Sequence, residues 1–307
     1  MRARLTVLGL VAFALLDVVL VYLAVAHVRD AAPAGAAVSA PSPTSSPTSG
    51  STDSSSDPTG PPATGDPTGP PATGSARRLL LESAPGVVLR ATRGSCAGDT
   101  PGSIELATSG EDFSVVAGDT GVVEILSLEV LSRQDLAFAG ADEACQVSRY
   151  VSTDGGASWD QAAADTGWRL SLDGDRTVQS PTGPVQPGCT VRSVHGLAPL
   201  EARVLCRNRD VMGTVDGGTT WEVISDDLPG LVAVAYRDLS LAYALASTKD
   251  CPAGVYATLD AGTTWTPTAC LEGEQPQALA VDPGGRAVAQ VDGAIQVSTN
   301  GASWRAW

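Results

Sequence analysis

The sequence predicts an all-β fold for most of its length, and three observations support this prediction. Glycine and valine are frequent, aromatic residues make up only 5%, and strong helix-forming runs are scarce. A polar, glycine-rich phrase ending in tryptophan, VSTDGGASWD at 151–160, returns further along the chain. Upstream of it, paired apolar runs flank polar turns, as in LVAVAYRDLSLAYALAST at 231–248. Short apolar runs separated by tight turns are typical of β-strands.

The recurring phrase has the pattern Ser/Thr-x-Asp-x-Gly-x-Ser/Thr-Trp. Its three full copies contain Ser152, Asp154, Gly156 and Trp159; Thr214, Asp216, Gly218 and Trp221; and Thr258, Asp260, Gly262 and Trp265. A copy one residue shorter contains Ser298, Asn300 and Trp304, and a degraded one at 104–113 ends in Phe113. From aromatic to aromatic, the steps are 46, 62, 44 and 39 residues. Three steps are near the length of one four-stranded propeller blade, and the long step leaves room for an insertion or a reduced blade.

The phrase resembles the Asp-box, or BNR, repeat of sialidases, sortilin-type receptors, xyloglucanases and photosystem assembly propellers. The resemblance covers roughly residues 79–307 and implies a β-propeller of about five to six blades. It also implies that each box turns between the third and fourth strands of a blade, at the periphery and away from the ligand face. The residue chemistry agrees, because aspartate accepts hydrogen bonds from turn N–H groups and glycine adopts positive φ readily. We therefore expect the box residues to be structural.

The apolar runs divide the repeat region into blades. We expect five, at about 79–117, 118–165, 188–225, 229–270 and 275–307. Residues 166–187 form either a sixth, reduced blade or an inserted hairpin. The strand at 79–90 is expected to complete the last sheet and protect its edge.

The N-terminal part differs from the repeat region, so the predicted organisation is an anchor at 1–30, a linker at 31–76 and the propeller at 77–307. The run Leu5 to Ala26 is apolar except for Thr6 and Asp17, which is enough for one bilayer crossing as a helix. Arg2 and Arg4 precede it and predict a cytoplasmic N-terminus with the propeller outside. The alternative is secretion after cleavage following Ala26, at an Ala-x-Ala site.

The segment 31–76 consists mainly of Ala, Pro, Ser, Thr, Gly and Asp, and DPTGPPATG occurs twice in tandem at 57–74. Such a composition cannot bury enough apolar surface to offset the entropy of ordering. We expect a disordered stalk that holds the propeller away from the membrane.

Six cysteines in an exported domain predict disulfide bonds. In the blade register, four of them follow a second strand, one precedes a first strand and one follows a fourth. These positions share the face opposite the boxes. The predicted pairs are Cys251 with Cys270, Cys189 with Cys206, and Cys96 with Cys145.

Catalytic signals are weak, and we predict neither catalytic residues, nor a metal site, nor a cofactor. The sialidase Arg-Ile-Pro motif and arginine triad pattern are not found. The acid pairs Asp142/Glu143 and Asp226/Asp227 are expected on a solvated surface. His195 is expected to be a packing residue. Arg207 and Arg209 form a basic spot, more readily explained by an ion pair than by a ligand contact.

The sequence thus predicts a membrane-tethered, extracytoplasmic binding or assembly module for a protein or glycan ligand. The net charge of −15 excludes nucleic acid as an expected partner. The alternative is a glycan-acting hydrolase, sialidase-like or of another glycosidase type, with a non-standard active site. Convergent carboxylates in a central cleft would favour this alternative.

Overall fold

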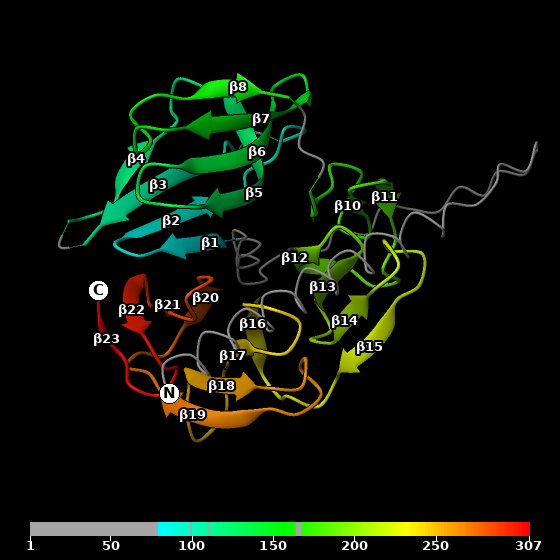
Figure 1. Cartoon of the computed structure of the whole chain (residues 1–307), viewed down its shortest axis with the longest axis vertical. Helices are drawn as coiled ribbons and strands as arrows, with labels where there is room; N and C mark the ends of the chain where they lie inside the picture. Colours follow the sequence, from blue (N-terminus) through cyan, green and yellow to red (C-terminus); the bar gives the residue numbers. More distant parts are fainter. Residues whose placement is uncertain (1–78, 99, 110, 164–166) are drawn as a thin grey trace, which may run out of the picture. The chain divides into compact units, whose positions relative to one another are not determined.

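The computed structural model of the protein describes residues 79–98, 100–109, 111–163 and 167–307. They form six antiparallel sheets, the blades of a β-propeller (Figure 1). The expected anchor and linker, at 5–26 and 31–76, lie outside the described residues. Within the described ranges, no helix has the length and hydrophobicity that a membrane span needs.

Each blade is a simple meander, with strands paired in chain order. Blade 1 contains β1 (Leu79–Ala84), β2 (Val87–Thr92), β3 (Ser103–Thr108) and β4 (Ser114–Val116). Blade 2 contains β5 (Val122–Val130), β6 (Leu136–Asp142), β7 (Val147–Ser152) and β8 (Asp160–Ala162). Blade 3 contains β9 (Arg169–Leu170), β10 (Val178–Ser180) and β11 (Gly183–Val185).

The remaining blades each have four strands. Blade 4 contains β12 (Val191–Ala198), β13 (Glu201–Cys206), β14 (Val211–Thr214) and β15 (Glu222–Ser225). Blade 5 contains β16 (Leu231–Tyr236), β17 (Ala242–Ala246), β18 (Gly254–Thr258) and β19 (Thr266–Cys270). Blade 6 contains β20 (Pro276–Val281), β21 (Ala287–Val291), β22 (Ala294–Ser298) and β23 (Arg305–Ala306).

The first strands of the blades form the inner ring. Each contacts the first strand of the next blade, in the order β1, β5, β9, β12, β16 and β20, and β20 contacts β1 again. Five of these strands, β1, β5, β12, β16 and β20, run in the same direction (Figure 1). Strand β9 runs the opposite way, because Trp168 before it contacts the Ala198 carbonyl at the end of β12, whereas Asp175 after it accepts from the Val191 N–H at the start of β12.

The predicted closure is wrong. Strand β1 does not complete the last sheet; it pairs with β2 from Leu79 opposite Thr92 to Ala84 opposite Val87. The turn between β1 and β2 is only two residues long and has Gly86 at φ +80°, so the local hairpin forms readily. Blade 6 supplies all four of its own strands, and the ring closes by packing of β1 against β20.

The segment at 166–187, for which two alternatives were open, contains a reduced third blade. Strand β9 contacts β5 on one side and β12 on the other, as the first strand of a blade does. Its outer strand β11 contains Pro184, a residue that edge strands tolerate. The propeller therefore has six blades, one with three strands.

The hydrophobic core lies between neighbouring blades. One cluster joins blades 1 and 2 around Phe138, and another joins blades 5 and 6 around Leu245 and Val255. The second strands are covered on both faces and are rich in alanine, as in Ala242–Ala246, where every residue is buried. Small side chains at these positions let adjacent sheets approach closely.

Candidate functional site

The propeller has two faces, named here by their turns. In the four-stranded blades, the box-turn face carries the turns between first and second strands and the boxes between third and fourth strands. Their disulfide face carries the turns between second and third strands and the connections between blades. The first strands of these blades run from the disulfide face to the box-turn face, so residues late in those strands lie near the box-turn end.

The three full boxes make the same hydrogen bonds. In the blade 4 copy, Thr214 Oγ1 accepts from the Gly218 N–H at 3.0 Å and donates to Asp216 Oδ1 at 2.8 Å. Asp216 then accepts from the Thr220 N–H at 3.0 Å and from its hydroxyl at 2.7 Å. The copies at 152–159 and 258–265 repeat these contacts.

These hydrogen bonds favour the charged carboxylates and lower the pKa values of Asp154, Asp216 and Asp260 to about 2. The largest contributions come from the Ser158 hydroxyl for Asp154, the Thr220 N–H for Asp216 and the Thr258 hydroxyl for Asp260. The shifts are therefore products of the turns themselves and do not indicate catalysis.

The box tryptophans lie between blades. The Trp265 Nε1 donates to Ser225 Oγ, in the preceding blade, at 3.1 Å. The Trp159 ring meets Phe138 edge-on at 4.9 Å, in the cluster shared by blades 1 and 2, and Trp221 meets Trp168 of the blade 3 segment at 6.0 Å. Each box thus fastens its hairpin to the neighbouring blade as well as to its own.

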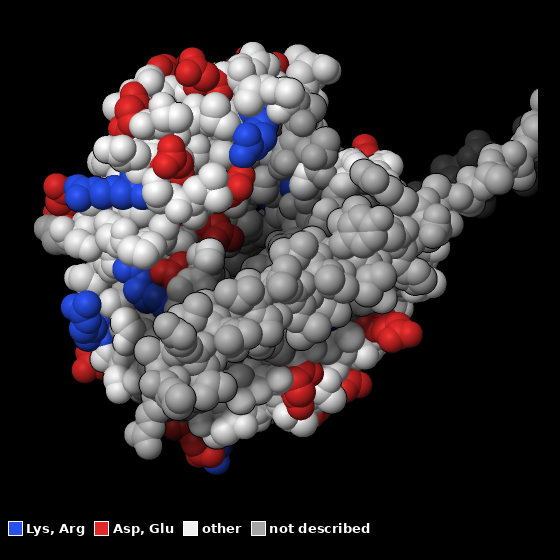
Figure 2. All heavy atoms as spheres, viewed as in Figure 1, with Lys and Arg blue, Asp and Glu red and all other residues white. Residues whose placement is uncertain are grey.

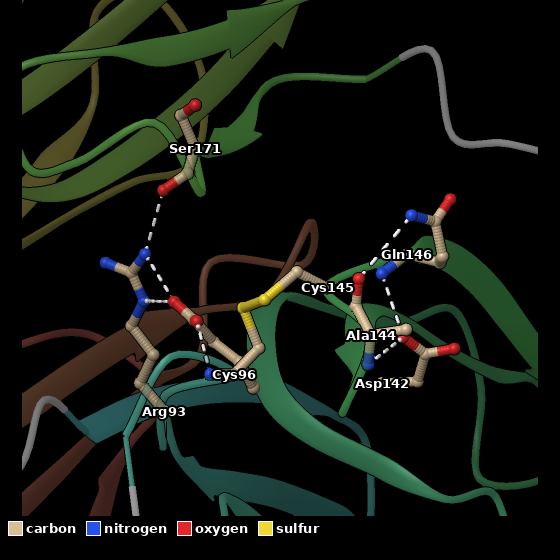
Figure 3. Close-up of a disulfide and its surroundings, with 8 residues drawn as sticks. Arg93, Cys96, Asp142, Ala144, Cys145, Gln146 and Ser171 are labelled. Carbon is tan, nitrogen blue, oxygen red and sulfur yellow. Dashed lines mark hydrogen bonds and ion pairs between the residues drawn. A yellow bond between two sulfur atoms is a disulfide. The ribbon is translucent and has the colours of Figure 1, made fainter.

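All six cysteines are paired. The bonds are Cys96–Cys145, Cys189–Cys206 and Cys251–Cys270, the pairs expected from the blade register. Topology places all three on the disulfide face. The first joins blades 1 and 2, and Figure 3 shows it beside Asp142, which accepts from the Ala144 and Gln146 N–H groups.

A chain of ion pairs crosses the same face. Arg93, after β2, pairs with Glu124 of β5 at 2.7 Å and donates to the Ser171 carbonyl of blade 3 at 2.9 Å (Figure 3). Glu124 also accepts from the Cys96 N–H at 3.0 Å. Arg207 pairs with Asp175 at 3.0 Å, which confirms the ion pair expected there. Blades 1 to 4 are thereby linked.

A cavity of about 1350 Å³ occupies the centre of the ring. Its walls come mainly from β1, β5, β12, β16 and β20 and mix leucines such as Leu128 and Leu197 with polar residues. The ionisable side chains on the wall include Glu82, Glu129 and His195. This cavity is called the central channel. Figure 2 shows acidic residues spread over the visible face, some of them set back in its central recess.

Three channel residues have displaced pKa values, and in one of them burial raises the pKa of the Tyr236 hydroxyl. Burial, followed by the negative charge of Glu129, raises the pKa of Glu82 to about 8. Burial lowers the pKa of His195 to about 4, and its Nε2 lies 3.4 Å from Ser193 Oγ. At neutral pH the Glu82 carboxyl is therefore largely protonated and the imidazole is neutral.

The sequence analysis did not identify Glu82 or Glu129. Both follow leucine near the end of a first strand, in LLLESA of β1 and LSLEV of β5. A charged residue interrupting an inner-strand leucine run in two neighbouring blades was the available signal. The acid pairs Asp142/Glu143 and Asp226/Asp227 do not line the channel. Among the described residues, no group of three or more His, Cys, Asp or Glu could hold a metal ion.

Neither a protein-family model nor a curated protein matches the sequence. Solved structures do resemble the fold. YCF48 bound to a D1 peptide is 16% identical, with 76% of this chain and 71% of that chain covered and a TM-score of 0.31. A GH74 enzyme from Niastella koreensis is 14% identical, with 74% and 41% covered and a TM-score of 0.25.

The lectin of Aleuria aurantia, solved with Fucalpha1-6GlcNAc, is 10% identical, with 75% of this chain and 94% of the lectin covered and a TM-score of 0.44. At these identities and TM-scores, none of these likenesses assigns a function to this chain.

Proposed function

We propose that the protein is a membrane-tethered, extracytoplasmic β-propeller that acts as a binding or assembly module for a protein or glycan ligand. The central channel is the observation that carries the proposal. A cavity of about 1350 Å³ whose wall combines apolar side chains with polar and ionisable groups has the composition of a binding site. The resemblance to Asp-box propellers, in which the boxes lie away from the ligand, agrees with this choice.

The placement outside the cytoplasm is supported by the cysteines and the N-terminal sequence. All six cysteines form disulfides, which persist in oxidising compartments. The apolar run Leu5 to Ala26, preceded by Arg2 and Arg4, has the properties of an uncleaved anchor. The Pro/Ser/Thr-rich segment that follows supplies a spacer.

Site-specific photocrosslinking of the full-length protein in its native membranes tests the proposal. A photoreactive amino acid is placed at Ser127, on the channel wall, or as a control at Thr299, in the exposed turn of the last box. We expect a discrete adduct from position 127 and none from position 299. Protease added from outside should release the propeller by cutting within 31–76. Adducts from both positions alike, or a propeller protected from external protease, would contradict the proposal.

A glycan-acting hydrolase is the second candidate, and Glu82 and Glu129 are the observation that favours it. Glycosidases use two carboxyl groups, one of which holds a proton at neutral pH. In this case the full-length protein would release reducing sugar from a cell-surface glycan, and both Glu82→Gln and Glu129→Gln would abolish the release. A wild-type protein without such activity would remove the candidate.

A further inference from the structure

The box-turn end of the central channel carries two carboxyl groups on neighbouring strands. Glu82 lies in β1 and Glu129 in β5, and these strands contact each other. Each residue lies within two positions of the strand's box-turn end. The side chain of Glu129 is 48% exposed and lies at the mouth, whereas Glu82 is partly buried.

The two carboxyl groups differ in their partners. The Glu129 carboxylate forms an ion pair with the Arg149 guanidinium, with 2.7 Å between nitrogen and oxygen. The Glu82 carboxyl makes no hydrogen bond or ion pair with any residue of the described ranges. Strand β20 brings no charged residue to β1, and Arg90 of β2 is paired with Glu105. Glu82 is therefore a carboxyl group inside a cavity, facing another carboxylate without a cation of its own.

A second acceptor without a donor lies on the channel wall toward the disulfide face, where Gln290 is opposite Ala278 early in β20. Gln290 of β21 is only 5% exposed and lines the channel. Its Oε1 has no hydrogen-bond partner among the described residues. A buried acceptor without a donor costs free energy, which a donor supplied by a ligand would recover.

The cationic residues of the channel lie at the other end. Arg192 is the second residue of β12 and Arg207 follows β13, which places both toward the disulfide face. Arg207 is paired with Asp175. Between the two ends the wall includes apolar side chains in the middle of the first strands, among them Leu126, Val194 and Leu279.

We infer that the channel receives a basic side chain, a lysine or arginine of a protein partner, whose cationic head group is bound by Glu82 and Glu129. The inference rests on the proposed function and selects a protein over a glycan as its ligand. Lysine and arginine each have a head group that only donates hydrogen bonds and an apolar stem. The head group suits the two carboxyl groups, and the stem suits the leucines of the channel wall. The net charge of −15 attracts a basic partner over long range.

Two other ligand classes fit less well. A metal ion would need more ligands than the two carboxylates provide. A sugar would need an open aromatic face, whereas Trp168 packs edge-on to Trp221 and donates to the Ala198 carbonyl. The Tyr236 hydroxyl likewise donates to the Ala261 carbonyl.

Binding of a cation should release a proton, because the pKa of Glu82 is raised to about 8 and a nearby positive charge favours the carboxylate. The charged or titratable groups on the surrounding strands include Glu124 and Glu129 of β5, Arg90 of β2, Arg149 of β7, which pairs with Glu129, and, across the channel, His195 and Tyr236. Glu124 is paired with Arg93, and His195 stays neutral near pH 7 because burial lowers its pKa to about 4. Glu82 is therefore the expected source of the proton.

The test uses full-length protein in detergent and two capped heptapeptides, one with a central lysine and one with norleucine, which has the same apolar stem without the charge. Affinity is measured by fluorescence anisotropy, and proton release by calorimetry at pH 7 in two buffers of different ionisation enthalpy. The variants are Glu82→Gln, Glu129→Gln and the matched control Glu222→Gln, in the exposed part of β15. Retention of the three disulfides and of the melting temperature establishes that each variant is folded.

We expect the lysine peptide to bind the wild type at least 10-fold more tightly than the norleucine peptide, with proton release. Glu82→Gln should abolish the proton release, and either channel variant should reduce the preference to less than about 3-fold. Glu222→Gln should leave it unchanged. Equal binding of the two peptides, or a preference that survives both channel variants, would overturn the inference. If the peptide results contradict the inference but the photocrosslinked adduct at position 127 still forms, the proposed function stands. If the adduct is also absent, both the inference and the proposed function are wrong.

Discussion

The box-turn face and the disulfide face of this propeller are stabilised by different means. On the box-turn face, the same set of hydrogen bonds recurs in blades 2, 4 and 5. On the disulfide face, no two blades are alike. One disulfide joins blades 1 and 2, another holds the entry into blade 4, and the third lies within blade 5. Repeated contacts are encoded within a few residues, while the unrepeated ones join residues distant in sequence.

The difference suggests where specificity resides. A turn present in several blades serves a purpose that those blades share, namely holding a hairpin and its tryptophan against the next sheet. The channel carboxyls Glu82 and Glu129 occur only in blades 1 and 2, where they break the leucine pattern of the first strands. Features confined to one or two blades are better candidates for ligand recognition than those that repeat.

The largest effect is expected from the disulfide between blades. Replacing both Cys96 and Cys145 by serine removes a link with a sequence separation of 49 residues, and the free energy of unfolding should fall by about 4 kcal/mol in the loop-entropy description. Replacing Cys251 and Cys270, separated by 19 residues within blade 5, should cost about 3 kcal/mol. Denaturant titration without reductant measures both. A larger loss from the blade 5 pair would contradict this ordering.

A smaller loss is expected from a box tryptophan. Trp265→Ala removes a partly buried ring and the hydrogen bond to Ser225, so the free energy of unfolding should fall by about 3 kcal/mol. Leu259→Ala in the same box is the control, because Leu259 is 79% exposed and its loss should change stability by no more than about 0.5 kcal/mol. Thermal unfolding measures both variants. Loss of peptide binding with an unchanged melting temperature would indicate that the box has a functional role.

The two faces also differ in how far the sequence predicted them. The boxes were predictable because Thr214, Asp216 and Thr220 contact one another within one turn. The disulfides followed from the blade register, since topology alone places those cysteines on one face. Closure of the ring was predicted wrongly, because the competition between two partners for β1 is decided by the short turn at Gly86.

The channel chemistry was less accessible to sequence analysis. Glu82 and Glu129 are 47 residues apart and meet only because β1 and β5 are neighbours in the ring. The missing donor at Gln290 depends on side-chain packing within blade 6 and the channel wall. Neither the meeting of the two carboxyls nor the missing donor can be read from a local sequence pattern. The sequence does show a glutamate within a leucine run in two strands, but that observation alone has several explanations.

The smallest effect should distinguish the channel from the boxes by pH. Glu82 has an ordinary pKa of 4.5 and one of about 8 in the fold, so the folded state holds more protons between these values. Its contribution to the free energy of unfolding is present below pH 4.5 and is lost as pH rises through 8. His195, lowered from 6.5 to about 4, acts in the opposite direction only below pH 6.5. The wild type should therefore lose stability between pH 6.5 and 8, and Glu82→Gln should be flatter there.

The boxes should respond at the acidic end instead. Asp216 has an ordinary pKa of 3.8 and one of about 2 in the fold, so its contribution is present above pH 3.8 and is lost as pH falls through 2. Asp216→Asn should keep the turn, because Asn300 already accepts the Ala302 and Ser303 N–H groups in the last box. The variant should fold normally at pH 7 and lose less stability than the wild type between pH 4 and 2. Denaturant titrations across both pH windows measure these slopes. An Asp216→Asn variant with a changed slope above pH 6.5, or a Glu82→Gln variant with a changed slope only below pH 4, would mean that the channel and the boxes do not titrate separately.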